Sequence, residues 1–82
     1  MSGDDIRHRV LDILGGIAPE ADLATLPGGV PLRETLDLDS MDFLNFLIAV
    51  AQSTGVEIPE SDYHLVRTFS GCRDYLGRHA AR

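Results

Sequence analysis

The stretch "SMDFLNFLIAVAQSTG", Ser40 to Gly55, has the clearest helical periodicity in the chain. At about 100° per residue, one face of such a helix collects most of the large apolar side chains, so this face must point into the core. The residues of this face are Phe43, Phe46, Leu47, Val50 and Thr54. Gly55 readily adopts the left-handed conformation that ends a helix. We therefore predict a core-facing helix from Ser40 to Thr54.

A second apolar stripe lies nearly opposite that core face. Met41, Leu44 and Ile48 are spaced i, i+3 and i+7, which places them on one side of the helix. A helix at the outside of a small bundle can hardly bury two opposite faces, so we expect this stripe to be exposed. An apolar patch surrounded by charge is typical of a transient docking surface. The alternative is that the long preceding loop covers the stripe.

The segments before this helix have contrasting patterns. An apolar stripe predicts a helix over 4–18, which Pro19 ends, and its members are Ile6, Val10, Ile13, Leu14 and Ile17. Prolines and glycines argue against a continuous helix from Pro19 to Asp39, although "ADLAT" could form one turn. The residues that could hold this long loop on the core are Leu23, Leu26, Val30, Leu32, Leu36 and Leu38.

Two shorter helices are predicted after Gly55. Pro59 suits the first position of a short helix over about 59–65. Thr68 can cap a last helix that runs through Leu76 and ends at Gly77. Its inward-facing residues are Phe69, Cys72, Tyr75 and Leu76. Without strand alternation or repeats, the sequence predicts an all-α fold in a single domain over 1–82, with its core at about 4–77.

The composition narrows the class of protein. A chain of 82 residues can form one core but has little room for an enclosed catalytic cavity, which favours a binding or carrying role. The single cysteine, Cys72, excludes an intramolecular disulfide, as is usual in a reducing compartment. We find neither a secretory signal nor the roughly 20 apolar residues of a membrane span, and we expect a cytoplasmic monomer.

The net charge of -6 is concentrated in the middle of the chain. The segment from Glu34 to Asp62 contains seven acids and no Lys or Arg. Such a segment repels nucleic acid and anionic membranes, and it attracts basic protein surfaces. A merely solvated surface would also explain the charge. It would not explain why a serine lies in its midst.

Ser40 stands at the start of the main helix, where Ser40 or Asp39 could simply be the N-cap. A nucleophilic serine has little support, because His64 lies on a separate short helix and the G-x-S-x-G motif is absent. An exposed hydroxyl at the positive end of a helix is better suited to carry a phosphodiester. The surrounding acids could hold the basic enzyme that delivers this group.

Metal binding is poorly supported by the same residues. "DLDSMDFLNFLI" begins like a calcium loop, but Met41, Asp42 and Ile48 stand at the fifth, sixth and twelfth positions, where an oxygen ligand, glycine and glutamate are needed. Cys72 has neither a second cysteine nor a spaced histidine pair as partner, and we expect it in the core.

The sequence resembles the acyl carrier proteins. The resemblance rests on "DLDSMDFLNFLIAVAQSTGVEIP", with the tripeptide Asp39-Ser40-Met41, and on "TFSGCRDYL". It covers about residues 4–77 and implies a four-helix bundle with a long loop between the first and second helices and a short third helix. It also implies that Ser40 carries 4′-phosphopantetheine, taken from coenzyme A by a separate Mg-dependent phosphopantetheinyl transferase.

By the same resemblance, the thiol of this arm would hold acyl groups as thioesters, and catalysis would belong to partner enzymes. Those partners would be acyl-transferring and acyl-modifying enzymes with basic docking surfaces, in fatty acid, other lipid, polyketide or another specialised acyl metabolism. The implied docking residues are Asp37, Asp39, Met41, Asp42, Leu44, Ile48 and Glu57. A peptidyl or aminoacyl carrier is the alternative within the class, and an unmodified acidic helical adaptor is the alternative outside it.

The chain departs from the family pattern in two places. Asn45, Ala51 and Gln52 replace the acids that are usual along the main helix, which favours recognition by apolar side chains and a dedicated pathway over the general fatty acid synthase. Asp37 stands where glycine usually makes the turn before the motif. Because Asp tolerates positive φ better than most residues, we expect the turn to survive.

Overall fold

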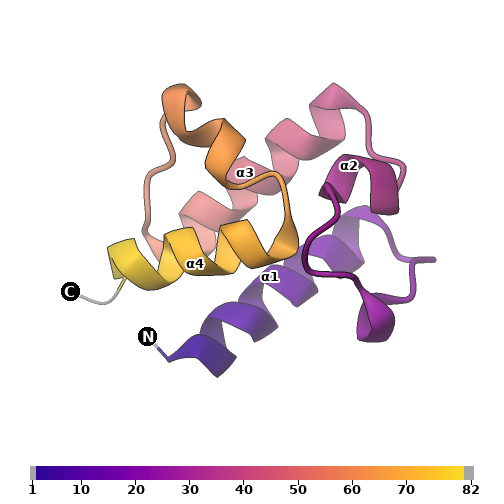
Figure 1. Cartoon of the computed structure of the whole chain (residues 1–82), viewed down its shortest axis with the longest axis horizontal. Helices are drawn as coiled ribbons and strands as arrows, with labels where there is room; N and C mark the ends of the chain where they lie inside the picture. The colour runs from indigo at the N-terminus through magenta and orange to yellow at the C-terminus, as the bar shows by residue number, and fades with distance from the viewer. Residues whose placement is uncertain (1, 81–82) are drawn as a thin grey trace.

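The computed structural model describes residues 2–80, and the elements assigned within this range are helices without any strand. In chain order the elements are α1 (Gly3–Ile17), the 3-10 helix η1 (Leu23–Thr25), α2 (Leu32–Thr35), α3 (Ser40–Thr54), the 3-10 helix η2 (Glu60–Leu65) and α4 (Phe69–Ala80) (Figure 1). The predicted all-α fold is confirmed. Among these described helices, none has the length and apolarity needed to cross a bilayer.

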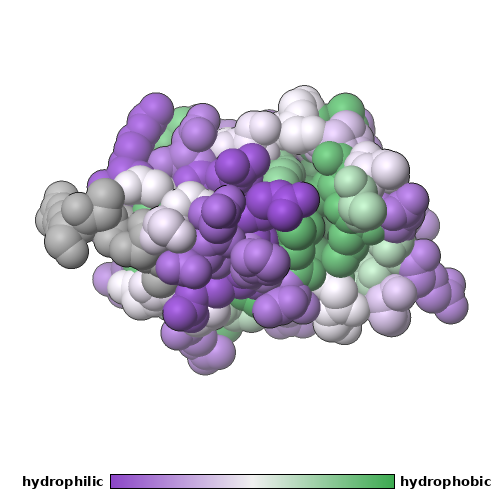
Figure 2. Space-filling view, turned by 90° about the horizontal axis from the view of Figure 1, so that it is seen from below, coloured by the Kyte–Doolittle hydropathy of each residue, from purple (hydrophilic) through white to green (hydrophobic). Residues whose placement is uncertain are grey.

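The three longest helices enclose one apolar core. α1 packs against both α3 and α4, and in Figure 1 the start of α1 and the end of α4 lie on the same side of the molecule. Fully buried side chains come from α1, α2, α3, α4 and the residue that follows η2: Val10, Leu14, Leu32, Phe46, Val50, Val66, Cys72 and Leu76. The view from below shows an apolar area beside a mainly hydrophilic one, so the small fold does not bury all of its apolar surface (Figure 2).

Helix α1 follows the sequence prediction closely. The Ser2 side chain caps it by accepting a hydrogen bond from the Asp5 N–H at 3.2 Å. The helix ends at Ile17, directly before the residue that precedes Pro19. Of the predicted stripe, Ile6, Val10 and Leu14 are buried, whereas Ile13 and Ile17 are half-buried at its edge.

Helix α3 has the predicted bounds, from Ser40 to Thr54. Gly55 ends it in the left-handed conformation, with φ 73°. Phe46, Leu47 and Val50 are buried on the predicted core face, and full burial of such a side chain contributes roughly 1.5–3 kcal/mol. Phe43 and Thr54 lie at the edge of this face and are half-buried.

The loop between α1 and α3 is more ordered than the sequence suggested. It contains η1 in the "ADLAT" segment and also α2, a single helical turn that we did not predict. Leu32 and Leu38 are buried, and Leu23, Leu26 and Leu36 pack partly against the core. The expectation for Val30 was wrong, because this side chain is 38% exposed. The Leu32 N–H instead anchors the loop by donating to the Arg67 carbonyl at 2.8 Å.

The two C-terminal elements required corrections. The short helix η2 is a 3-10 helix over Glu60–Leu65, and Pro59 is its extended N-cap, not its first helical residue. Thr68 caps α4 as predicted, since its hydroxyl accepts from the Gly71 N–H at 2.9 Å. The predicted stop at Gly77 was wrong: Gly77 is helical without a positive φ, and α4 continues to Ala80. Arg78 and His79 therefore belong to the last turn of α4, and residues 81–82 lie outside the described part.

Two buried residues of α4, Cys72 and Tyr75, predict that the fold loses stability at alkaline pH. Burial raises the pKa of the Cys72 thiol from 9.0 to about 12. Burial, and then the hydrogen bond that the Tyr75 hydroxyl donates to Asp62, raise the pKa of Tyr75 from 10.0 to about 12. The unfolded chain loses the thiol proton of Cys72 and the hydroxyl proton of Tyr75 at a lower pH than the folded chain does. The stability that these two neutral groups contribute is therefore present below about pH 9 and is lost as the pH rises toward 12. For Cys72 alone the loss approaches about 4 kcal/mol.

The chain has no lysine, so cysteine and tyrosine are the side chains that titrate in this range. Urea unfolding followed by circular dichroism at pH 8, 9.5 and 11 measures the slope. Tyr75→Phe and Cys72→Ala should each be less stable at pH 8 and lose less stability between pH 8 and 11. Equal unfolding free energies of wild type at pH 8 and 11 would contradict the prediction.

Candidate functional site

Ser40 is the first residue of α3, and its side chain is exposed. The capping function belongs to Asp39, whose carboxylate accepts from the Asp42 N–H at 2.7 Å. The Asp42 carboxylate in turn accepts from the Asp39 N–H at 3.4 Å, which completes a capping box. Of the two possible N-caps, the structure therefore uses Asp39. The hydroxyl of Ser40 is left accessible at the positive end of the helix.

The turn that precedes α3 is made by Asp37. This residue has φ 53°, the one positive φ among the described residues other than glycine. The left-handed conformation lets the chain reverse, so that Leu38 enters the core and Asp39 begins the helix. The expectation that Asp37 can replace glycine at this turn is confirmed.

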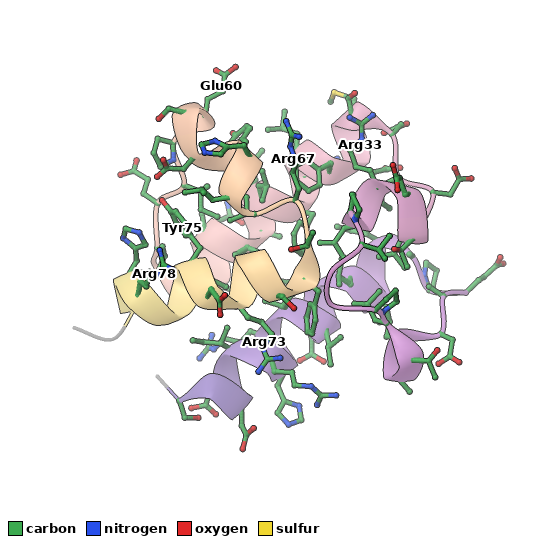
Figure 3. The ribbon with its side chains drawn as sticks, viewed as in Figure 1. Arg33, Glu60, Arg67, Arg73, Tyr75 and Arg78 are labelled. Carbon is green, nitrogen blue, oxygen red and sulfur yellow. The ribbon has the colours of Figure 1, made fainter. Side chains whose placement is uncertain are left out.

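An arginine that the sequence analysis did not select contacts Ser40. The Nη2 of Arg33, on α2, donates to the Ser40 Oγ at 3.2 Å. The same guanidinium approaches the Leu38 carbonyl through Nε at 3.5 Å, and the Leu38 N–H donates to the Arg33 carbonyl at 2.9 Å. Figure 3 shows Arg33 at the α2 end of the molecule, near the start of α3. The serine thus has a cation as its side-chain neighbour within a segment that is acidic in sequence.

The proposed docking residues are not all at one place. Asp37, Asp39, Met41 and Asp42 cluster at the start of α3, whereas Glu57 follows Gly55 at the opposite end. Asp37, Asp39 and Glu57 are exposed, and Asp42 is half-buried. An α-helix rises about 1.5 Å per residue, so the length of α3 separates Glu57 from Ser40.

The apolar stripe on α3 is largely open to solvent. Met41 is 62% exposed and Ile48 is 47% exposed, so the loop does not cover them. Leu44, between them, is half-buried, and the expectation of a fully outward Leu44 was wrong. The exposed apolar surface beside Ser40 therefore consists mainly of Met41 at the helix start and Ile48 two turns later.

Other nucleophiles and ligand sets are placed elsewhere. Cys72 is fully buried on α4, and His64 is an exposed residue of η2. Residues 2–80 contain no group of three or more His, Cys, Asp or Glu side chains arranged to hold a metal ion. The arrangement at Ser40 presents an accessible hydroxyl with a neighbouring guanidinium, which suits attachment of an anionic group better than attack by the serine.

The comparisons with known proteins point in the same direction. No protein-family model matches the chain. An acyl carrier protein from Lactobacillus acidophilus is 24% identical over 79 residues, which cover 96% of this chain and 98% of that protein. The match therefore extends over the whole fold and beyond the segment around Ser40. This full-length similarity confirms the resemblance to the acyl carrier proteins that the sequence motifs predicted.

Proposed function

We propose that the protein is a free-standing acyl carrier that holds acyl groups as thioesters on a 4′-phosphopantetheine arm attached to Ser40. The observation that carries the proposal is the exposed Ser40 hydroxyl at the start of α3, freed from capping by Asp39. The full-length similarity to a protein named as an acyl carrier protein supports the class of function. In this reading the chain is a carrier, and catalysis belongs to its partners.

The residues around Ser40 fit such an arm. The Ser40 oxygen is accessible, and the Arg33 guanidinium lies beside it as a partner for an anion. In the modification, the Ser40 oxygen forms a phosphodiester bond and loses its proton to the transferase. The phosphoanhydride of coenzyme A breaks, and its nucleotide half leaves. When bound, the arm supplies a terminal thiol, which forms thioesters.

The docking surface of this carrier would begin at Ser40. Asp39 and Met41 flank the modified residue, and Ile48 continues the exposed apolar surface along α3. Basic and apolar side chains of the transferase and of acyl-handling enzymes would complement it. Because Asn45 and Gln52 replace acids on the exposed part of α3, apolar contacts would weigh more, as suits a dedicated acyl pathway.

The test is the modification of the purified protein with coenzyme A, Mg²⁺ and a broad-specificity phosphopantetheinyl transferase. Intact mass should increase by one arm per chain. A thiol reagent at pH 8 should then label the folded, modified protein once, because the buried Cys72 has its pKa raised to about 12 and does not compete. The unmodified folded protein should not be labelled.

The outcomes separate the classes of function. Absence of modification by several such transferases would overturn the carrier proposal and favour the unmodified adaptor, which uses the same Met41 and Ile48 surface. Labelling of Ser40 by a serine-reactive phosphonate would instead indicate a hydrolase. We expect arm transfer and no phosphonate labelling.

A further inference from the structure

The position of Arg33 is fixed by the fold and not by chance contact at the surface. Its carbonyl accepts from the Leu38 N–H at 2.9 Å, and Leu38 is buried. The turn at Asp37, with φ 53°, returns the chain from α2 to α3 between these two bonded residues. The backbone of Arg33 is therefore held next to the start of α3, and its guanidinium reaches the Ser40 Oγ at 3.2 Å.

In the unmodified protein, the Arg33 guanidinium has a weak partner in the neutral hydroxyl of Ser40. At an exposed position, a hydrogen bond to a neutral hydroxyl contributes little to stability. The two carboxylates nearest to Ser40 along the chain, Asp39 and Asp42, are engaged with N–H groups of the α3 capping box. A phosphodiester on the Ser40 oxygen would place a full negative charge within reach of the guanidinium, which forms shorter and stronger bonds with phosphate oxygens.

A second cation lines the adjoining surface. A surface cavity of about 620 Å³ is bounded by Pro31, Arg33, Glu34, Leu38, Phe43, Tyr63 and Arg67. Figure 3 shows Arg33 and Arg67 pointing toward the same side of the molecule from neighbouring segments. Those segments are joined by the bond from the Leu32 N–H to the Arg67 carbonyl at 2.8 Å. The cavity that Arg33 borders thus has two arginines and one acid among its lining residues, which favours an anion.

We infer that Arg33 binds the phosphodiester of the arm on Ser40 and directs the start of the arm over the cavity that Arg67 borders. This inference rests on the proposed carrier function. Arg33 is then a positioning residue: on modification its guanidinium exchanges a neutral hydroxyl for an anionic phosphate oxygen. The predicted consequence is that modification stabilises the fold, and that the gain depends on Arg33.

The experiment compares the melting temperatures of unmodified and modified protein for wild type, Arg33→Gln, Arg33→Lys and Arg7→Gln. Arg7 is an exposed residue of α1, and its replacement removes the same charge away from Ser40. We expect modification to raise the melting temperature of wild type and Arg7→Gln by about 3 °C, the gain of one exposed charge-assisted contact in a domain of this size. Arg33→Gln should lose this gain, and Arg33→Lys should keep part of it.

A purely structural role of Arg33 would give a different result. If Arg33 only braces the Leu38 carbonyl, Arg33→Gln lowers both melting temperatures equally and keeps the gain, which would overturn the inference. A wild type without any gain would overturn it as well. Intact mass is measured first, so a wild type that takes no arm reports failure of the proposed function instead.

A second readout uses wild type alone, in case Arg33→Gln is a poor transferase substrate. Nuclear magnetic resonance follows exchange of the Arg33 guanidinium protons with water before and after modification. We expect exchange to slow severalfold in the modified protein and to recover in about 1 M salt, where exposed charges are screened. Unchanged exchange at low salt would overturn the inference even if no variant could be modified.

Discussion

Replacing Ser40 by alanine is expected to abolish arm transfer completely while leaving the fold intact. The variant lacks the Ser40 oxygen to which the arm would be attached, and the other four serines lie away from the start of α3 in the sequence. The stability of α3 should be unchanged, because Asp39 and Asp42 form the capping box without the Ser40 side chain. The lost contact with Arg33 is exposed, so the free energy of unfolding should change by no more than about 0.5 kcal/mol.

The matched control is Ser61→Ala. The chain contains five serines, and Ser61 is exposed on η2, away from the α3 N-terminus. Intact mass after incubation with coenzyme A, Mg²⁺ and the transferase should show one arm on Ser61→Ala and none on Ser40→Ala. Circular dichroism melts of both variants should match wild type. An arm on Ser40→Ala would show that attachment occurs elsewhere and would remove the basis of the docking surface.

The sequence was most informative where one physical rule decides an element by itself. The α3 bounds follow from the apolar period together with Gly55, the glycine that takes a positive φ. The turn at Asp37 was expected from the family resemblance, and the tolerance of Asp for the left-handed region allows it. By contrast, a glycine without such a requirement misled us at Gly77, because α4 continues through it. Glycine permits a stop, but it does not impose one.

The centre of the candidate site was visible in the sequence, and its surroundings were not. Ser40, Asp39 and Met41 are adjacent in the chain, so their motif is visible in sequence. Arg33 lies outside the acidic segment, and its contact with Ser40 depends on α2, a helical turn too short to leave a periodic signal. The only available hint was that an arginine immediately precedes the acidic run.

The three-dimensional charge pattern also differs from the linear one. Arg33 reaches the start of α3, and Arg9 on α1 reaches its other end, where Nη1 donates to the Ser53 carbonyl at 2.7 Å. A cation at a helix C-terminus is stabilising, so Arg9 has a structural reason for its position. The segment without Lys or Arg is therefore flanked by arginines in space. If the protein docks as we propose, this arrangement would reduce the electrostatic part of docking and increase the part left to Met41 and Ile48.

The apolar docking surface gives the second large expected effect. Ile48→Asp should lower kcat/KM of the phosphopantetheinyl transferase for this protein about tenfold or more, while helicity and stability remain close to wild type. Ile48 is 47% exposed, so the substitution costs the core little but places a carboxylate where an apolar contact is expected. The measurements are transferase kinetics at varied carrier concentration and a thermal melt of the variant.

Two neighbouring positions separate docking from folding. Leu47 is 2% exposed, and Leu47→Asp would bury an unpaired carboxylate, which we expect to cost more than about 4 kcal/mol and to abolish cooperative unfolding. Asn45→Asp adds the same charge at an exposed position of α3 without removing apolar surface, so kcat/KM should be maintained. If Ile48→Asp behaves like Asn45→Asp, apolar docking is wrong; if it melts like Leu47→Asp, Ile48 belongs to the core. The adjacent side chains Leu47 and Ile48 thus test opposite faces of one helix.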